Sequence, residues 1–162
     1  MTPTLRRVAA WLAGAWAGLV AAVGFVASPL VFATLPRADA GRVAARLFAV
    51  DATIGVCAGA LLLLLAFQLA RRAAEQGASR FSTDMLLVLA ALFCIVAGHY
   101  AVQPMMEARL RGENGPSFAV LHGVASAFFL VKFLAVAVVA WRLTGAPSAR
   151  ASDQATTAGP TS

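Results

Sequence analysis

The chain alternates between long apolar stretches and short polar intervals. About 20 consecutive apolar residues cross the hydrocarbon core of a bilayer as an α-helix, and four stretches reach or approach this length. The pattern therefore predicts an all-α integral membrane bundle of four transmembrane helices. The expected spans are residues 8–35, 51–70, 85–103 and 118–141.

Prolines and a charged interval refine these spans. Pro29 removes one backbone hydrogen bond and is expected to bend the first helix, and Pro104 is expected to end the third. Between the first two spans, apolar positions recur with helical spacing opposite arginines. This favours a short interfacial amphipathic helix after the first span. Its charged residues are Arg37, Asp39, Arg42 and Arg46.

The composition supports a lipid environment. The 162 residues are 60% hydrophobic and 12% charged, whereas a soluble domain is about 45–50% apolar and about 25% charged. The net charge of +6 comes from arginines at the ends of the apolar stretches, which excludes a nucleic-acid-binding class and leaves the bilayer as the expected partner. Residues 1–142 form the expected membrane domain, and the polar segment 143–162 is expected to be disordered.

The first apolar stretch is longer than the ~7–15 residues of a signal-peptide core, so we expect it to be retained. Cys57 and Cys94 each lie inside an apolar stretch and are expected to be buried, without a disulfide.

The distribution of arginines favours cytoplasmic N- and C-termini in the inner (cytoplasmic) membrane. The expected inner side carries Arg6, Arg7, Arg71, Arg72, Arg80, Arg142 and Arg150, and the outer side Arg37, Arg42, Arg46, Arg109 and Arg111.

Polar residues inside the spans are costly and mark candidate sites. His99 lies five residues before Pro104 and His122 five residues after Ser117, which places both about 7 Å inside the same membrane face. The predicted polar cluster near that face consists of Asp51, His99, Gln103, His122 and Ser126. The two histidines are candidate metal ligands or members of a proton relay, and structural hydrogen bonding is the alternative. The sequence identifies no cofactor.

Lys132 is the most unusual residue, since it lies about 15 Å along the helix from Arg142. Asp51 is expected near the opposite face, which leaves snorkelling, stacking on an aromatic ring or a place in a substrate path. Gly14 with Gly18 and Gly55 with Gly59 form two GxxxG spacings, which favour close helix packing or a homo-oligomer interface.

Three segments together resemble a known family. They are residues 29–48, beginning Pro-Leu-Val-Phe-Ala-Thr-Leu-Pro-Arg, residues 103–107 and residues 118–126. They resemble vertebrate transmembrane protein 205 and its small bacterial relatives, which carry a domain of unknown function. The resemblance spans residues 8–142. It implies four membrane helices and an association with resistance to metal-containing drugs.

Three functions remain open. The preferred one is transport or resistance involving a metal or a cationic compound, without enzymatic activity. The second is a non-catalytic scaffold or assembly factor. The third is a haem- or copper-linked redox protein, which a distant similarity to copper-resistance D-type domains suggests but which lacks the histidine expected on the first helix.

Overall fold

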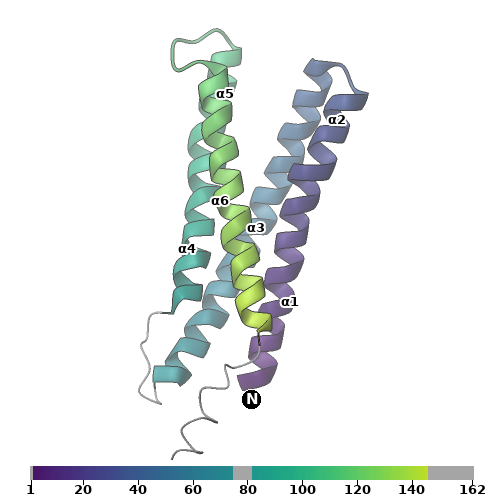
Figure 1. Cartoon of the computed structure of the whole chain (residues 1–162). Coiled ribbons are helices and arrows are strands. Elements are labelled where there is room, and N and C mark those ends of the chain that lie inside the picture. The colour runs from purple at the N-terminus through teal and green to yellow at the C-terminus, as the bar shows by residue number, and fades with distance from the viewer. Residues whose placement is uncertain (1, 75–81, 146–162) are drawn as a thin grey trace, which may run out of the picture.

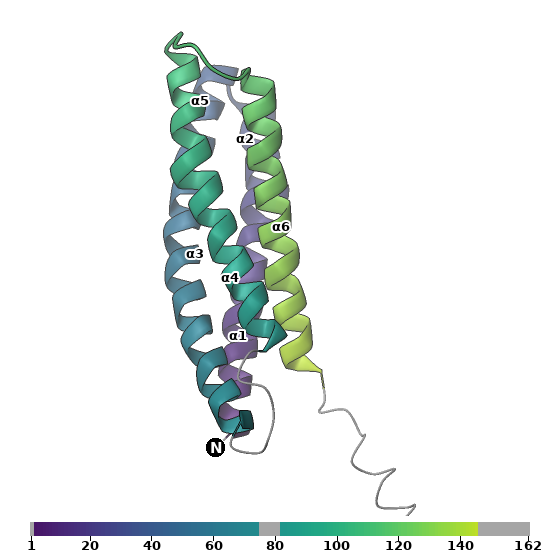
Figure 2. The same ribbon diagram turned by 90° about the vertical axis from the view of Figure 1, so that its left-hand side faces the viewer.

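The computed structural model describes residues 2–74 and 82–145. In these ranges the chain is helical and contains no strand. It forms four long rods that lie side by side along one axis (Figures 1 and 2). The elements are α1 (Thr2–Ala21), η1 (Ala22–Ala27), α2 (Ser28–Thr34), α3 (Arg37–Ala74), α4 (Thr83–Ile95), η2 (Val96–Val102), α5 (Gln103–Leu110) and α6 (Phe118–Thr144).

The expected number of four spanning helices is confirmed, although the second and third extend well beyond their expected bounds. Each rod is long and apolar enough to cross a membrane: Pro3–Thr34, Arg37–Arg72, Thr83–Leu110 and Phe118–Thr144. Large apolar side chains also remain exposed around the outside of the bundle, for example Leu64, Phe93 and Trp141. This distribution suits a protein whose outer surface contacts lipid instead of water.

Two of the rods contain a π-helical segment just before a proline. The Ser28 amide donates to the Val23 carbonyl and the Gln103 amide to the Gly98 carbonyl, five residues back in each case. Pro29 and Pro104 follow directly, at the start of α2 and α5. The wider π-turns accommodate residues that cannot join a regular α-helical ladder. The third span therefore does not end at Pro104, as the sequence indicated, but continues to Leu110.

The interfacial helix predicted after the first span is not a separate element. Residues 37–50 continue into the second span as one helix, α3, which has 38 residues. No proline or turn sequence interrupts this stretch, so nothing stops the helix. At about 57 Å, α3 exceeds the ~30 Å hydrocarbon core, so its first turns can carry charge beyond the apolar region.

The helices form an antiparallel bundle in which each packs against two neighbours. α1 packs against α3 and α6, and α4 packs against the same two helices. α3 and α6 therefore lie diagonally across the bundle and run in the same direction, as do α1 and α4. The four helices share one hydrophobic core, which consists of Ala9, Ala13, Trp16, Val20, Ala52, Ala58, Leu62, Val88, Ala91, Ile95, Ala135, Val136 and Val139.

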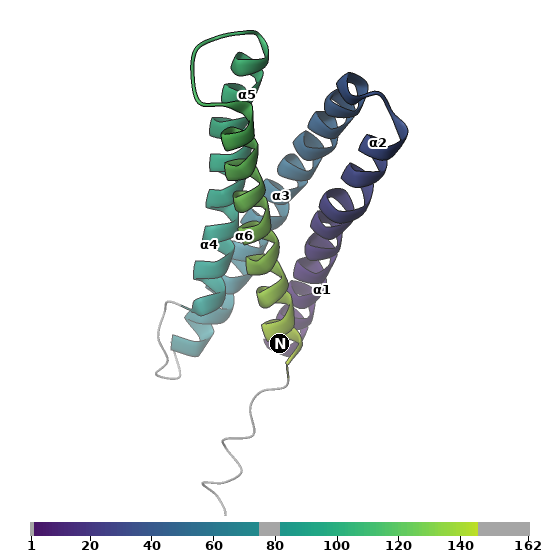
Figure 3. The same cartoon turned by 45° about the horizontal axis from the view of Figure 1, so that its top comes forward.

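We call the end of the bundle near Arg6 and Arg142 the basal end, and the end formed by α2 and α5 the distal end. Towards the distal end the bundle divides into two pairs, because α2 packs on α3 and α5 on α6, while α2 packs on neither α5 nor α6. Figures 1 and 3 show these pairs diverging.

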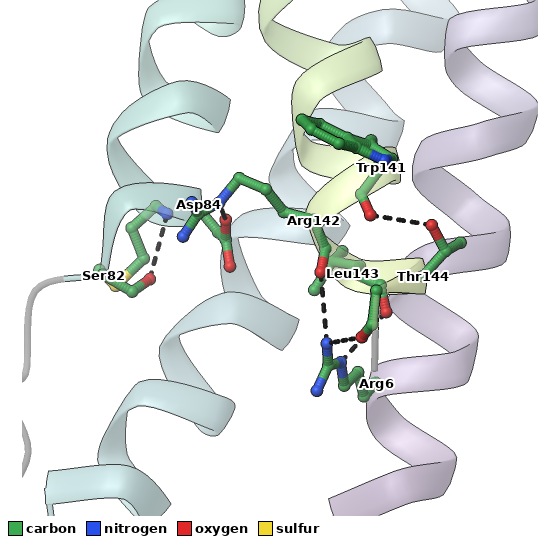
Figure 4. A network of polar contacts seen from close by, with 9 residues as sticks. Arg6, Ser82, Asp84, Trp141, Arg142, Leu143 and Thr144 are labelled. Carbon is green, nitrogen blue, oxygen red and sulfur yellow. Dashed lines mark hydrogen bonds and ion pairs between the residues drawn. The ribbon is translucent and has the colours of Figure 1, made fainter. Parts of the chain in front are cut away.

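Polar contacts join the helices at the basal end (Figure 4). Arg6 of α1 donates to the carbonyl oxygens of Leu143, Arg142 and Gly145 at the end of α6. Arg142 pairs with Asp84 at the start of α4, with Nε 2.6 Å from Oδ1. The start of α1 and the end of α6 thus lie on the same side. Arg80, Arg150 and most of the predicted disordered tail lie outside the described residues.

The two GxxxG spacings have different surroundings. A Cβ added at Gly59 would lie 2.6 Å from Leu92 Cδ2 and 3.2 Å from Trp16 Cη2, so side chains of α4 and α1 fill this face of α3. Gly14 and Gly18 are exposed, with no atom within 4 Å of an added Cβ. Only the pair on α3 takes part in packing within the described chain.

We predict that Gly59→Val destabilises the bundle, whereas Gly14→Val does not. Overpacking a filled core costs about 1–3 kcal/mol, and Gly14 faces open space. Thermal unfolding of the detergent-purified variants measures the difference. Equal midpoints for the two variants would contradict the packing described for α3.

Candidate functional site

A buried ion pair crosses the centre of the bundle. Lys132 Nζ on α6 donates to Asp51 Oδ2 on α3, and their side chains are 6% and 2% exposed. Among the described residues, these two are the buried ones that can carry a full charge at neutral pH. Because α3 and α6 are diagonal, the pair lies across the bundle axis.

The helix starts bring the two residues to one level. Asp51 comes 14 residues after Arg37, where α3 begins, and Lys132 comes 14 residues after Phe118, where α6 begins. Both helices run from the distal end, so each charged residue lies about 21 Å from its helix start. The long lysine side chain reaches across the axis to the short aspartate.

This pairing corrects the prediction that Asp51 lies near a membrane face and that Lys132 has no acidic partner. The prediction assumed that the second helix begins at Asp51, whereas it begins at Arg37. Of the three alternatives left open for Lys132, the structure shows stacking on an aromatic ring, because Nζ lies 4.6 Å from the centroid of the Phe129 ring.

The polar groups of the site are incompletely paired. Asp51 Oδ1 and Trp16 Nε1 are buried and have no hydrogen-bond partner among the described residues. Trp16 Nε1 lies 3.2 Å from the position of a Cβ at Gly55, one helical turn from Asp51. Removing polar groups from water without a partner costs roughly 1–3 kcal/mol each, so the site retains binding capacity that the chain itself does not use.

Aromatic rings cover the ion pair on its distal side. Phe48 and Phe129 precede Asp51 and Lys132 by three residues each. Their rings meet edge to face with centroids 5.5 Å apart. The edge of Phe25 approaches the same group, 6.3 Å from Phe129, and the Phe129 ring occupies the space that a side chain at Gly24 would need.

The other members of the predicted polar cluster lie apart from this pair. His99 is half-buried and meets Tyr100 edge to face, at a centroid distance of 4.9 Å. His122 is exposed and stacks on Phe118. Gln103 is half-buried and Ser126 exposed.

Within the part of the chain that the structure describes, no hydrogen bond or ring contact joins His99 to His122, and no group of three or more His, Cys, Asp or Glu side chains could hold a metal ion. Metal binding by the two histidines stays a prediction. Cys94 is buried as expected, but Cys57 is exposed on the surface of α3.

Sequence reasoning missed Trp16 and Phe129 as parts of the site. The signal that could have located them is the equal distance of Asp51 and Lys132 from their helix starts, together with the phenylalanine three residues before each.

Comparison with protein families gives one match. A domain of unknown function, DUF4149, matches residues 11–114. The chain belongs to the DUF4149 family. The part of the chain matched to the DUF4149 domain contains Trp16, Phe48 and Asp51 but ends before α6, which contributes Phe129 and Lys132. No curated protein and no solved structure matches the chain.

We predict that Lys132→Met lowers the thermal stability of the protein and that Asp51→Leu combined with Lys132→Met restores most of it. Breaking one side of a buried pair costs about 3–5 kcal/mol, because a charge remains without its partner, whereas apolar replacement of both residues is often neutral or stabilising. The measurement is a double-mutant cycle of unfolding midpoints in detergent.

Arg142→Gln is the matched control for this cycle. It breaks the partly exposed basal pair with Asp84, and such pairs contribute about 0–1 kcal/mol. The assignment of Asp51 and Lys132 as a coupled pair fails if the double variant is as unstable as the sum of its single variants.

Proposed function

We propose that this protein transports a cationic compound across the inner membrane or confers resistance to one, without catalysing a reaction, and that Asp51 and Lys132 are its working site. The observation that carries this proposal is the Asp51 carboxylate, which is 2% exposed at the centre of a membrane bundle with one oxygen unpaired. Ionisable groups at such depth are expensive and are characteristic of substrate and ion pathways.

The position of the pair supports a role in movement. Asp51 and Lys132 join diagonal helices on the basal side of the ring contacts of Phe129, and further towards the distal end the bundle divides into the α2–α3 and α5–α6 pairs. A cation that competes with Lys132 for Asp51 would release this link. The two helix pairs would then be free to change their separation at the distal end, which is how rocking of helix pairs around a fixed site gives alternating access.

Sequence features support the cellular setting that we propose. The start of α1 and the end of α6 share the basal end, and the arginines there favour a cytoplasmic basal side. The resemblance to transmembrane protein 205 and its bacterial relatives agrees with a resistance role. Four narrowly packed helices leave little room for a wide pathway, so we also propose that the protein works as a homo-oligomer.

A non-catalytic scaffold is the second candidate. The observation that favours it is the density of ties between helices, since the Asp51–Lys132 pair joins α3 to α6 while the Arg6 and Arg142 contacts tie α6 to α1 and α4. For a scaffold, the ion pair only holds the bundle together.

We expect proteoliposomes containing the protein to take up at least one cation from a panel of organic ammonium ions and copper(I), above the rate of empty liposomes. Asp51→Asn should reduce that uptake at least about tenfold, because the carboxylate that receives the cation is gone. The measurement is the initial rate of uptake of each labelled ion.

Asp39→Asn is the matched control, since Asp39 is an exposed carboxylate of the same helix, and it should transport as the unmodified protein does. A folded Asp51→Leu, Lys132→Met variant should be inactive if the pair works in transport. Transport would be ruled out in favour of a scaffold if no cation moves through the unmodified protein.

A further inference from the structure

The Lys132 ammonium group is held in the way that proteins hold ammonium ligands. A carboxylate oxygen of Asp51 accepts its hydrogen bond, and the Phe129 ring lies 4.6 Å from Nζ. An anion together with the negative face of an aromatic ring is the combination that recognises organic ammonium groups. Both side chains are buried, which strengthens both attractions by excluding water.

We propose that Asp51 and Phe129 form a binding site for the primary ammonium group of an alkylamine, and that Lys132 is the resident occupant of this site. The proposal rests on the proposed function and names its substrate class. The ligand would replace the lysine ammonium at the carboxylate and place its alkyl chain among apolar side chains.

The chemistry of the site selects this class of ligand. Asp51 offers two oxygens, one of which is unpaired, so it can accept hydrogen bonds from a group that carries several N–H donors. Divalent calcium or magnesium requires about six oxygen ligands, and the described residues bring no cluster of three potential metal-ligating side chains together. A soft metal would need several sulfur or imidazole ligands, but both histidines lie outside the site and Cys94 is the one buried thiol among the described residues.

The direction from which a ligand enters follows from the aromatic rings on the distal side of the ion pair. Phe48 and Phe129 lie three residues towards the distal end from Asp51 and Lys132, and their rings meet edge to face. On that side the helix pairs diverge. A ligand from the distal end would therefore separate the Phe48 and Phe129 rings before it reaches the carboxylate.

Chemical rescue tests this site. Lys132→Ala removes three methylene groups and the ammonium, and n-propylammonium supplies the same atoms. We expect n-propylammonium to raise the unfolding midpoint of the purified Lys132→Ala variant by roughly 5 °C, because a ligand bound only to the folded state stabilises it. n-Propanol, which has a similar shape but no charge, should leave the midpoint unchanged. n-Propylammonium should stabilise the unmodified protein less than the Lys132→Ala variant, because there it must first displace Lys132.

Two double variants locate the effect. Asp51→Asn with Lys132→Ala should lose the response, and Phe129→Leu with Lys132→Ala should need several times more n-propylammonium for the same shift. Phe93→Leu with Lys132→Ala is the matched control, because Phe93 is exposed and packs on Phe128 instead. If Lys132→Ala does not fold alone, recovery of folded protein when n-propylammonium is present during purification gives the same readout.

The proposal is overturned if n-propylammonium neither stabilises nor recovers Lys132→Ala, or if it acts equally on the Asp51→Asn double variant. These outcomes are separable from failure of the proposed function. Rescue without cation uptake by the unmodified protein supports the ammonium site and contradicts transport, whereas uptake without rescue contradicts the site and leaves transport in place.

Discussion

A charge buried at the centre of a bilayer needs an opposite charge at the same depth, and this requirement governs the arrangement of the bundle. Asp51 and Lys132 meet this requirement by pairing between the diagonal helices α3 and α6. These two helices must therefore keep their positions along the bundle axis relative to each other. A shift of one residue in either helix would turn a charged side chain by about 100° and separate the pair. The geometry of the core therefore depends on the two positions where α3 and α6 begin, Arg37 and Phe118. Ser117 caps the start of α6 by accepting a hydrogen bond from the Val120 amide.

The spans could be predicted from sequence because each depends on the average polarity of about 20 residues, which a single residue hardly changes. Positions inside the bundle depend on where each helix begins. The arginines before Asp51 suggested a separate surface helix, so the sequence prediction placed Asp51 at the start of the second span. Asp51 lies 14 residues, or about 21 Å, further along the helix, at the level of Lys132. The histidines show a different limit. Spacing from Pro104 placed His99 too near its helix end, because α5 continues to Leu110, about 17 Å from His99. His99 and His122 therefore do not share one level as predicted, and only packing decides the direction that each ring faces, with His122 on the exposed surface.

The prolines and glycines also have surroundings that their sequence motifs do not specify. A proline within a helical stretch was expected to end or bend it, but π-turns before Pro29 and Pro104 let both rods continue. A GxxxG spacing indicates close approach without saying what approaches. On α3 the groups that approach the glycines are the side chains of Trp16 and Leu92. These bulky side chains of neighbouring helices occupy the space that the glycines leave.

The first and second halves of the described chain repeat one plan. In each, a rod with a π-turn and a proline runs to the distal end, and the next helix returns with a phenylalanine followed three residues later by a charge. The halves are thus two helical hairpins related by an approximate twofold axis along the bundle. Their equivalent positions carry opposite charges, Asp51 in one and Lys132 in the other. Two copies of either hairpin alone would bring like charges together in hydrocarbon, so the core can close only when one hairpin of each kind is present.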